Sequence, residues 1–265
     1  MTQIAAQMYT LREQCKTPAD IAASCAKLKK MGFGAIQASA SGFNEIPAAE
    51  LKKILDDNGM VCCATHWGLD KLANVDAAVD YHKAIGCELT AIGGFGFGGK
   101  PRAEWEAFVQ QYNAIAPRLA AKGLRLGYHN HSHELAPLDP DPKKLDPKQV
   151  PQQLLIDKLD KSVWFEIDTY WIAHGGADPA AWITKVAQSG PGRIPAIHCK
   201  DMTIDGGRNH KMCEVGVGNL NWTAILAAAK AAGVQWYIIE RDSGDLDPFE
   251  SLNISLNNMK AMGLS

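Results

Sequence analysis

The sequence has 265 residues, of which 46% are hydrophobic and 21% charged, as in an ordinary globular protein. Its 27 Lys and Arg nearly balance 29 Asp and Glu, so the formal net charge is −2 at pH 7. This balance excludes the strong basic excess of most nucleic-acid-binding proteins. A chain of this length folds as two domains or as one α/β barrel of roughly 250 residues.

The sequence also argues against membrane insertion and secretion. It contains no apolar run of the roughly 18 residues that a transmembrane helix needs, and its N-terminus lacks the basic and apolar regions of a signal peptide. The seven cysteines are scattered and form no CxxC pair. We therefore expect a cytoplasmic protein without a disulfide framework or a thiolate zinc site.

Short apolar runs alternate with helical segments along the whole chain. Several helical segments begin with a capping residue before proline, as in Asp178-Pro179, and end at a glycine such as Gly32 or Gly86. The runs are apolar throughout, which is typical of parallel strands that are buried on both faces. They lie near residues 3–9, 34–39, 61–66, 88–93, 124–130, 163–169, 194–199 and 236–241.

Eight strand-helix units in 265 residues leave about 33 residues for each, as in a (β/α)8 TIM barrel. We therefore predict a TIM barrel that forms a single domain over residues 1–265. The alternative is an open doubly wound sheet, which is disfavoured because no strand is followed by G-x-G-x-x-G. The proline-rich segment 136–151 is expected to be a loop insertion after the fifth strand, where it covers the substrate or contacts another subunit of a homo-oligomer.

Polar residues at the carboxyl ends of barrel strands are catalytic candidates. Because side chains alternate along a strand, His129 and His131 share one face, as do Glu166 and Asp168. Further along the chain, His198 and Glu240 stand at the ends of two more strands. Buried carboxylates must be paired or bound to a metal, so the pattern predicts a divalent cation bound by these strand ends.

Five segments together resemble the xylose-isomerase-like superfamily of sugar isomerases and epimerases. They are YHNHxxE at 128–134, FEIDTYW at 165–171, IHCKD at 197–201, EVGVGNLNW at 214–222 and YIIERD at 237–242. The resemblance extends over nearly the whole chain. It implies a TIM barrel with one divalent metal, held by Glu, Asp, His and Glu from the last four strands.

Carried over to this chain, the metal ligands are Asp168, His198 and Glu240, with Glu134 as the first ligand. Many members of the superfamily have Glu where this chain has His129, so His129 or His131 is the alternative first ligand. Three carboxylates and one imidazole suit Mn²⁺, Mg²⁺ or Co²⁺, with Zn²⁺ as a further option.

This site implies proton transfer α to a carbonyl of a sugar or cyclitol, through an enediolate. Glu134 and Glu240 are the expected acid/base pair of a ketose isomerase or epimerase. His129 and His131 would instead protonate a leaving group in a lyase or dehydratase acting on a keto-cyclitol or 3-keto-glycoside. Two non-isomerase alternatives are a sugar-binding barrel without catalysis and a DNA-repair endonuclease of the same superfamily. The net charge of −2 disfavours the endonuclease.

The remaining candidates surround this predicted centre. Glu166 and Asp201 are expected to position neighbouring groups, although Lys200 and Asp201 would also suit a local ion pair. Six residues are candidate substrate contacts, with core packing or a turn as their structural alternative: His66, Trp67, Trp171, His174, Lys200 and Glu214. His82 and His210 are expected at the surface.

The glycine-rich segment after the fourth strand resembles a phosphate-binding loop only in part. Residues 94–100 match G-x-x-x-x-G-K, but Pro101 stands where a P-loop needs Ser or Thr to bind Mg²⁺. We therefore predict a loop over the pocket, with Phe95 or Phe97 against the substrate.

Overall fold

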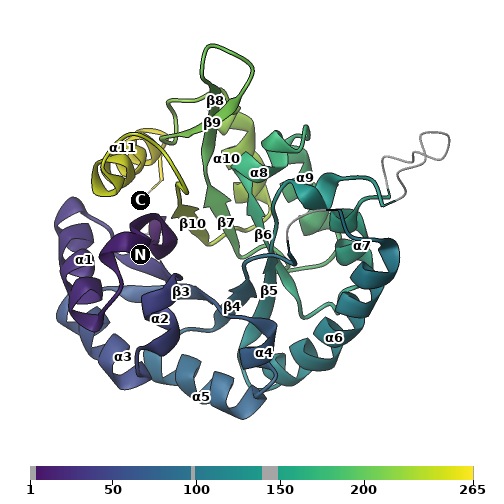
Figure 1. The fold of residues 1–265 in the computed structure, drawn as a ribbon, viewed down its shortest axis with the longest axis horizontal. Coiled ribbons are helices and arrows are strands. Elements are labelled where there is room, and N and C mark those ends of the chain that lie inside the picture. The colour runs from purple at the N-terminus through teal and green to yellow at the C-terminus, as the bar shows by residue number, and fades with distance from the viewer. Residues whose placement is uncertain (1–3, 97–98, 139–148, 265) are drawn as a thin grey trace.

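The computed structural model describes residues 4–96, 99–138 and 149–264 (Figure 1). Eight parallel strands form a closed barrel in the order β1-β10-β7-β6-β5-β4-β3-β2, which confirms the predicted fold class. The barrel strands are β1 (Ile4–Gln7), β2 (Ala35–Ala38), β3 (Val61–His66), β4 (Leu89–Ile92), β5 (Arg125–His129), β6 (Trp164–Asp168), β7 (Ala196–Cys199) and β10 (Trp236–Ile239).

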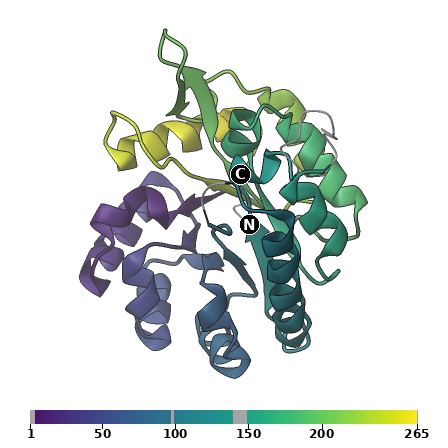
Figure 2. The same ribbon diagram turned by 45° about the vertical axis from the view of Figure 1, so that its right-hand side comes forward.

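Helices surround the barrel on the outside (Figures 1 and 2). The longer ones are α1 (Pro18–Met31), α3 (Ala48–Asp57), α5 (Val75–Ile85), α6 (Arg102–Ala120), α7 (Pro151–Lys158), α9 (Pro179–Gln188), α10 (Trp222–Ala231) and α11 (Pro248–Ala261). Shorter turns lie in the loops: η1 (Met8–Gln14), α2 (Ser41–Glu45), α4 (Leu69–Leu72), η2 (His133–Leu135) and α8 (Thr169–His174).

The capping signals in the sequence explain where several helices begin and end. Thr17 and Asp20 form a reciprocal capping box at the start of α1, and Asp178 accepts a hydrogen bond from the Ala180 amide at the start of α9. Gly32 ends α1 with φ +104°, a left-handed conformation that costs glycine little. The local sequence therefore sets the alternation of strands and helices.

Side chains from the strands fill the lower part of the barrel interior. Trp164 is fully buried there among small residues, including Ala5, Ala35 and Ala196. Gly127 belongs to the same layer, since a Cβ at that position would lie 2.2 Å from the Trp164 ring. Two residues further along the strands, the alternating pattern replaces this apolar layer with polar side chains.

An antiparallel hairpin departs from the regular strand-helix alternation. Strands β8 (Asp201–Ile204) and β9 (His210–Cys213) follow β7 and pair with each other, and both views show the hairpin beyond the barrel at the top (Figures 1 and 2). The sequence predicts a helical pattern after each barrel strand, so the hairpin departs from that prediction.

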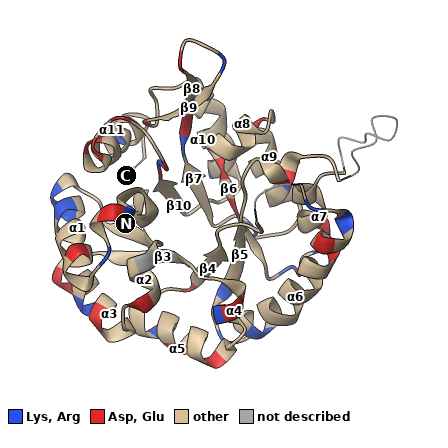
Figure 3. Cartoon of the chain, viewed as in Figure 1, with Lys and Arg blue, Asp and Glu red and all other residues tan. Residues whose placement is uncertain are grey.

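The structure also describes the cysteines and the surface charges. All seven cysteines carry free thiols. Within the described residues, no helix is long and apolar enough to cross a membrane. Acidic and basic residues are interspersed around the outer helices (Figure 3). Most of the predicted loop insertion, residues 139–148, lies outside the described residues, as does Phe97.

Candidate functional site

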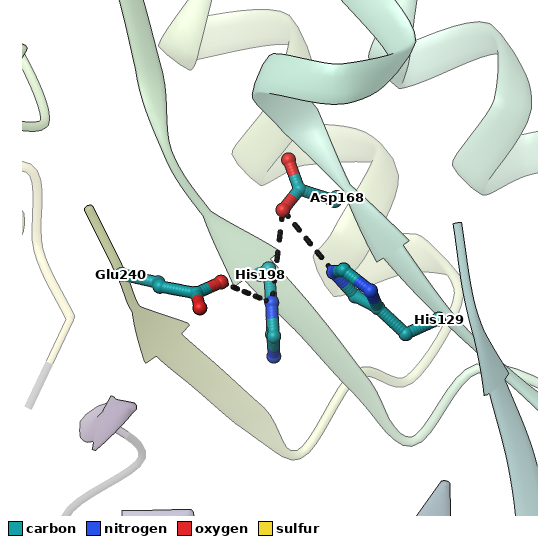
Figure 4. Close-up of side chains that lie close together, drawn as sticks. All are labelled: His129, Asp168, His198 and Glu240. Carbon is teal, nitrogen blue, oxygen red and sulfur yellow. Dashed lines mark hydrogen bonds and ion pairs between the residues drawn. The ribbon is translucent and has the colours of Figure 1, made fainter. Parts of the chain in front are cut away.

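Four side chains from successive strand ends converge at the carboxyl end of the barrel (Figure 4). His129 ends β5, Asp168 ends β6, His198 lies in β7 and Glu240 follows β10. All four are buried, and each offers one ligand atom within 4.8 Å of the others. Asp168 Oδ2 lies 3.3 Å from His129 Nε2, and Glu240 Oε2 lies 2.8 Å from His198 Nδ1. We call these four residues the central cluster.

The strand register and a helix cap aim Asp168 at this cluster. Asp168 pairs with His198 in the parallel ladder of β6 and β7. Its Oδ1 atom accepts a hydrogen bond from the Trp171 amide and so caps α8, while its own amide donates to Asn130 Oδ1. With Oδ1 held by the cap, Oδ2 faces His129 and His198.

A second layer of polar side chains fixes His198 from the opposite side. His198 Nε2 donates to Gln37 Oε1 at 2.6 Å, which leaves Nδ1 facing Glu240 and Asp168. Gln37 Nε2 in turn donates to Glu166 Oε1, and Gln7 Nε2 donates to Gln37 Oε1. Neither glutamine was among the predicted site residues, although an amide in each of two short buried strands was an available signal.

Glu166 lies beneath the central cluster, where the sequence analysis expects a positioning residue. It is fully buried, and its Oε2 atom lies 2.6 Å from His66 Nε2 and 3.2 Å from His198 Nε2. Burial alone would raise the pKa of Glu166, but the nearby His198 and His66 outweigh it and hold that pKa well below the ordinary value. Glu166 therefore supplies a fixed negative charge that orients two imidazoles.

Lys200 brings a positive charge into the same space. Its Nζ atom lies 2.8 Å from Glu240 Oε2, 3.1 Å from Asp168 Oδ2 and 3.0 Å from Asp242 Oδ1. Burial would lower the pKa of Lys200, but these three carboxylates raise it above its usual value. Asp242, which the sequence analysis did not single out, is thus the partner that holds Lys200 at the edge of the cluster.

The central cluster fits a divalent cation. The three buried carboxylates of Glu166, Asp168 and Glu240 outnumber the one buried ammonium group, that of Lys200. Buried carboxylates in excess need a compensating charge. Within the described part of the chain, His129 Nδ1 and His198 Nδ1 are buried and make no hydrogen bond. His198 Nδ1 faces Glu240 Oε2 at 2.8 Å, and that oxygen also pairs with Lys200 Nζ. Imidazole and carboxylate donors suit Mn²⁺, Co²⁺ or Zn²⁺.

Glu134, the expected first ligand, lies outside the central cluster. It is in η2, fully buried, where it accepts hydrogen bonds from the Tyr128 hydroxyl at 2.5 Å and from the His131 amide at 2.9 Å. Burial raises the pKa of Glu134 to about 7. The structure groups Glu134 with His131 and His133, and His129, the alternative ligand, completes the central cluster in its place.

Two adjoining cavities open above the central cluster. The inner chamber, of about 360 Å³, is lined by Tyr9, Ser39, His66, Gly93, His129, His131, Trp171, Lys200, Glu240 and Asp242. The outer chamber, of about 620 Å³, is lined by Tyr9, Ser39, Ala40, Asn44, His66, Trp67, Gly68, Leu69, Ile92, Gly93, Gly94, Phe95, Phe108 and Gln111. Tyr9 and Ser39 border both chambers and were missed by the sequence analysis.

The structure separates the expected substrate contacts into three groups. His66, Trp171 and Lys200 line the inner chamber, and Trp67 lines the outer one. His174 is exposed and lines neither chamber. Glu214 is buried outside both chambers, in an ion pair with Arg241 at 2.5 Å.

Asp201 faces the loop after β9 rather than Lys200. Its two carboxylate oxygens accept five hydrogen bonds, from the amides of Met202, Gly216, Gly218 and Leu220 and from the Trp222 indole. These contacts hold the loop in one conformation. Asp201 therefore positions backbone and not the groups of the central cluster.

The surface prediction for His82 is wrong. His82 is 1% exposed, donates from Nδ1 to the Ala78 carbonyl and lies 2.7 Å from the Thr65 hydroxyl. It is buried because α5 packs its inner face on the barrel, and His82 falls on that face among Val75, Ala78 and Val79. His210, by contrast, is exposed as expected.

Comparison with solved structures finds the same fold in sugar-processing proteins. A sugar phosphate isomerase/epimerase from Parabacteroides distasonis matches with a TM-score of 0.77 and 21% identity, over 99% of this chain and 94% of that one. An L-ribulose 3-epimerase matches at 0.71 and 14% identity, over 98% and 94% of the chains. A D-allulose 3-epimerase from Methylomonas sp. matches at 0.71 and 14%, over 98% and 97%.

Sequence comparison identifies the family. No curated protein matches this sequence. A family model described as xylose isomerase-like TIM barrel matches residues 25–262, which is most of the chain. The closed barrel agrees with that description, and the chain belongs to the xylose isomerase-like TIM-barrel family.

Proposed function

We propose that this protein is a divalent-metal-dependent sugar isomerase or epimerase that transfers a proton α to the carbonyl of a keto-sugar. The observation that carries the proposal is the central cluster, in which two imidazoles and two carboxylates converge under an open chamber. The names of the structural relatives, an L-ribulose 3-epimerase and a D-allulose 3-epimerase among them, support the same chemistry.

In this proposal His129, Asp168, His198 and Glu240 hold the metal, which is Mn²⁺, Mg²⁺, Co²⁺ or Zn²⁺. When bound, the ion would act as a Lewis acid for the sugar carbonyl and an adjacent hydroxyl. The hydrogen bond from His198 Nε2 to Gln37 keeps Nδ1 free to act as the donor atom. Asp168 is held by the α8 cap through Oδ1, so Oδ2 already faces the cluster.

The residues of the inner chamber supply the proton transfer. Glu240 lines the chamber, and its carboxylate removes the proton from the carbon next to the carbonyl. Lys200, 2.8 Å from Glu240, places an ammonium group where negative charge develops on the substrate oxygen. Asp242 holds Lys200 in that position through both of its carboxylate oxygens.

The protonation of the chamber histidines favours this reaction over the lyase alternative. Proton donation to a leaving group would need a charged imidazole on His129 or His131. Burial, together with neighbouring histidines, lowers the pKa of both residues, which disfavours the charged form of each. Neutral imidazoles suit metal binding and hydrogen bonding to the sugar.

Elemental analysis and solvent exchange test this proposal together. We expect about one divalent ion per chain after dialysis against Mn²⁺ or Co²⁺, and deuterium incorporation at the carbon next to the carbonyl when a ketose turns over in D2O. Protein that contains no divalent metal after this dialysis would contradict the proposed metal centre. Turnover without deuterium incorporation would contradict proton transfer and favour a hydride shift, whereas ligand binding without turnover in a ketose panel would indicate a non-catalytic sugar-binding barrel.

A further inference from the structure

The inner and outer chambers differ in chemistry, and we propose that the outer chamber binds a second, uncharged sugar ring linked to the ring that reacts over the central cluster. The substrate would then be a neutral disaccharide or similar glycoside, and neither a free monosaccharide nor a sugar phosphate. This inference rests on the proposed function, because it assumes that the reacting ring occupies the inner chamber.

The two chambers lie next to each other. Four residues line both of them, namely Tyr9, Ser39, His66 and Gly93. The inner chamber alone has a volume of about 360 Å³, which already lies within the roughly 300–1,000 Å³ typical of small-molecule sites. A single sugar ring therefore leaves the outer chamber, about 620 Å³ in volume, for another part of the ligand.

The outer chamber is built to contact an uncharged ring. Its walls carry Trp67, Phe95 and Phe108, with Leu69 beside them. Phe95 stacks on Phe108 at a centroid distance of 4.1 Å, and Trp67 packs on Tyr81 at 4.8 Å, so these aromatic groups are fixed before a ligand arrives. Fixed aromatic surface packs well on the apolar C–H faces of a sugar ring.

Polar groups that suit sugar hydroxyls lie at the rim of the same chamber. Asn44 and Gln111 are exposed and uncharged, and each side-chain amide both donates and accepts hydrogen bonds. Tyr9, at the junction of the two chambers, is 40% exposed although it is aromatic. One face of its ring is covered by Arg12 at 4.7 Å, which holds the ring at the entrance to the inner chamber.

The charges around the chambers argue against a phosphate group. Among the described residues that line the outer chamber, none is Lys or Arg. Two ammonium groups lie over aromatic rings of its walls, and both already have other partners. Lys71 Nζ is 4.0 Å from the Trp67 ring centroid and donates to the Asn44 carbonyl at 2.7 Å. Lys100 Nζ is 4.8 Å from the Phe95 ring centroid and pairs with Glu104 at 3.1 Å. In the inner chamber, Lys200 is already surrounded by three carboxylates. Phosphate recognition normally relies on uncommitted cationic or amide donors.

Glycines keep the junction between the chambers open. A Cβ on Gly93 would lie 3.5 Å from His66 Nδ1, and a Cβ on Gly94 would lie 2.9 Å from His131 Nδ1. Gly94 also has φ +123°, which favours glycine. Side chains at these two positions would narrow the space through which a two-ring ligand must extend.

Calorimetric titration of the metal-loaded protein tests this proposal. The probes are fructose, fructose 6-phosphate and lactulose, in which a galactose ring is linked to fructose. We expect lactulose to bind at least tenfold more tightly than fructose, and fructose 6-phosphate to gain nothing over fructose. Glucose and phenyl β-glucoside form a second pair of probes. If phenyl β-glucoside binds more tightly than glucose by the same factor as lactulose over fructose, any flat ring suffices, and the assignment to a sugar is overturned.

A variant that fills the outer chamber tests whether the tighter binding of lactulose than of fructose comes from that chamber. Leu69→Trp should reduce the lactulose-to-fructose affinity ratio to about one, because the indole would occupy the space of the second ring. Asp70→Trp, an exposed position on the same short helix α4 that does not line the chamber, is the matched control and should keep the ratio.

The outcomes separate this inference from the proposed function. Equal or undetectable affinity for fructose and lactulose in a protein that binds its metal would overturn the two-ring substrate alone, as would tightest binding of fructose 6-phosphate. Failure to bind any divalent metal would instead contradict the proposed function.

Discussion

Two halves of the barrel contribute different chemistry to one site. Strands β5, β6 and β7 and the end of β10 provide the ionisable groups of the central cluster. Strands β1 and β2 face them with uncharged amides, Gln7 and Gln37, which form a buried hydrogen-bonded chain to His198 and Glu166. The charged half would offer the ligands of the proposed metal, whereas the uncharged half fixes the orientation of these side chains without adding to an already negative site.

The largest effect is expected in the charged half. His198→Ala should abolish stoichiometric metal binding and lower kcat/KM by about a thousandfold or more, since it removes a donor atom and leaves Glu240 and Asp168 without their imidazole partner. Elemental analysis and steady-state kinetics measure both losses. Metal binding that survives the substitution would contradict the assigned cluster.

His82 is a buried histidine outside the charged half, and its pKa is shifted in the opposite direction to that of His198. Burial lowers the pKa of His82 to about 4, whereas Glu166 and Glu240 outweigh burial and raise that of His198. Since an unfolded histidine titrates near 6.5, the contribution of His82 to the free energy of unfolding is complete above that pH. It should decrease by about 3 kcal/mol as the pH falls from 6.5 to 4.

Denaturant unfolding at several pH values measures this contribution. His82→Gln retains hydrogen-bonding capacity toward Thr65 and Ala78 but does not titrate, so its stability should depend less on pH over this interval. The exposed His210 provides the control, His210→Gln, which should follow the parent protein. Identical pH profiles for all three proteins would show that His82 titrates normally.

In the uncharged half, Gln37→Leu should weaken metal binding about 10- to 100-fold, because His198 and Glu166 lose the amide that orients them. Ser39→Ala is a milder change in the same half, since the hydroxyl is 3.5 Å from His66 Nδ1, and it should alter metal affinity less than threefold. Equal effects of the two substitutions would remove the distinction between orientation and general packing.

The smallest effect is expected at Glu134. Because its carboxylate is held by Tyr128 and the His131 amide, Glu134→Gln should leave one metal ion per chain and change its affinity less than threefold. His129→Ala should lower the affinity at least tenfold in the same titration. The reverse order would restore Glu134 as the fourth ligand in place of His129.

The fold could be predicted because its signals are local. Apolar runs, caps and helix-ending glycines recur along the chain, and each predicted strand lies within a few residues of an observed one. The site was harder to predict, because the direction of a side chain depends on the local backbone conformation. His129 stands within β5, whereas Glu134 follows in a 3₁₀ turn that directs it to Tyr128.

Contacts between distant segments explain the remaining differences. Gln37 and Glu166 are separated by 129 residues, and nothing near Gln37 in the sequence marks it as a partner of a carboxylate. His82 follows the helical spacing of α5, but the sequence does not reveal that Thr65 and Trp67 would enclose it. Only the closed barrel brings these segments together.

The tryptophan layer inside the barrel has a consequence for the order of events at the site. Trp164 fills the interior directly below Glu166, and His198 is fully buried. An ion bound there would enter and leave through the inner chamber, which is also the path of the sugar. A bound sugar would then trap the ion, so the metal should bind first, and a chelator should remove it more slowly from the protein when substrate is present.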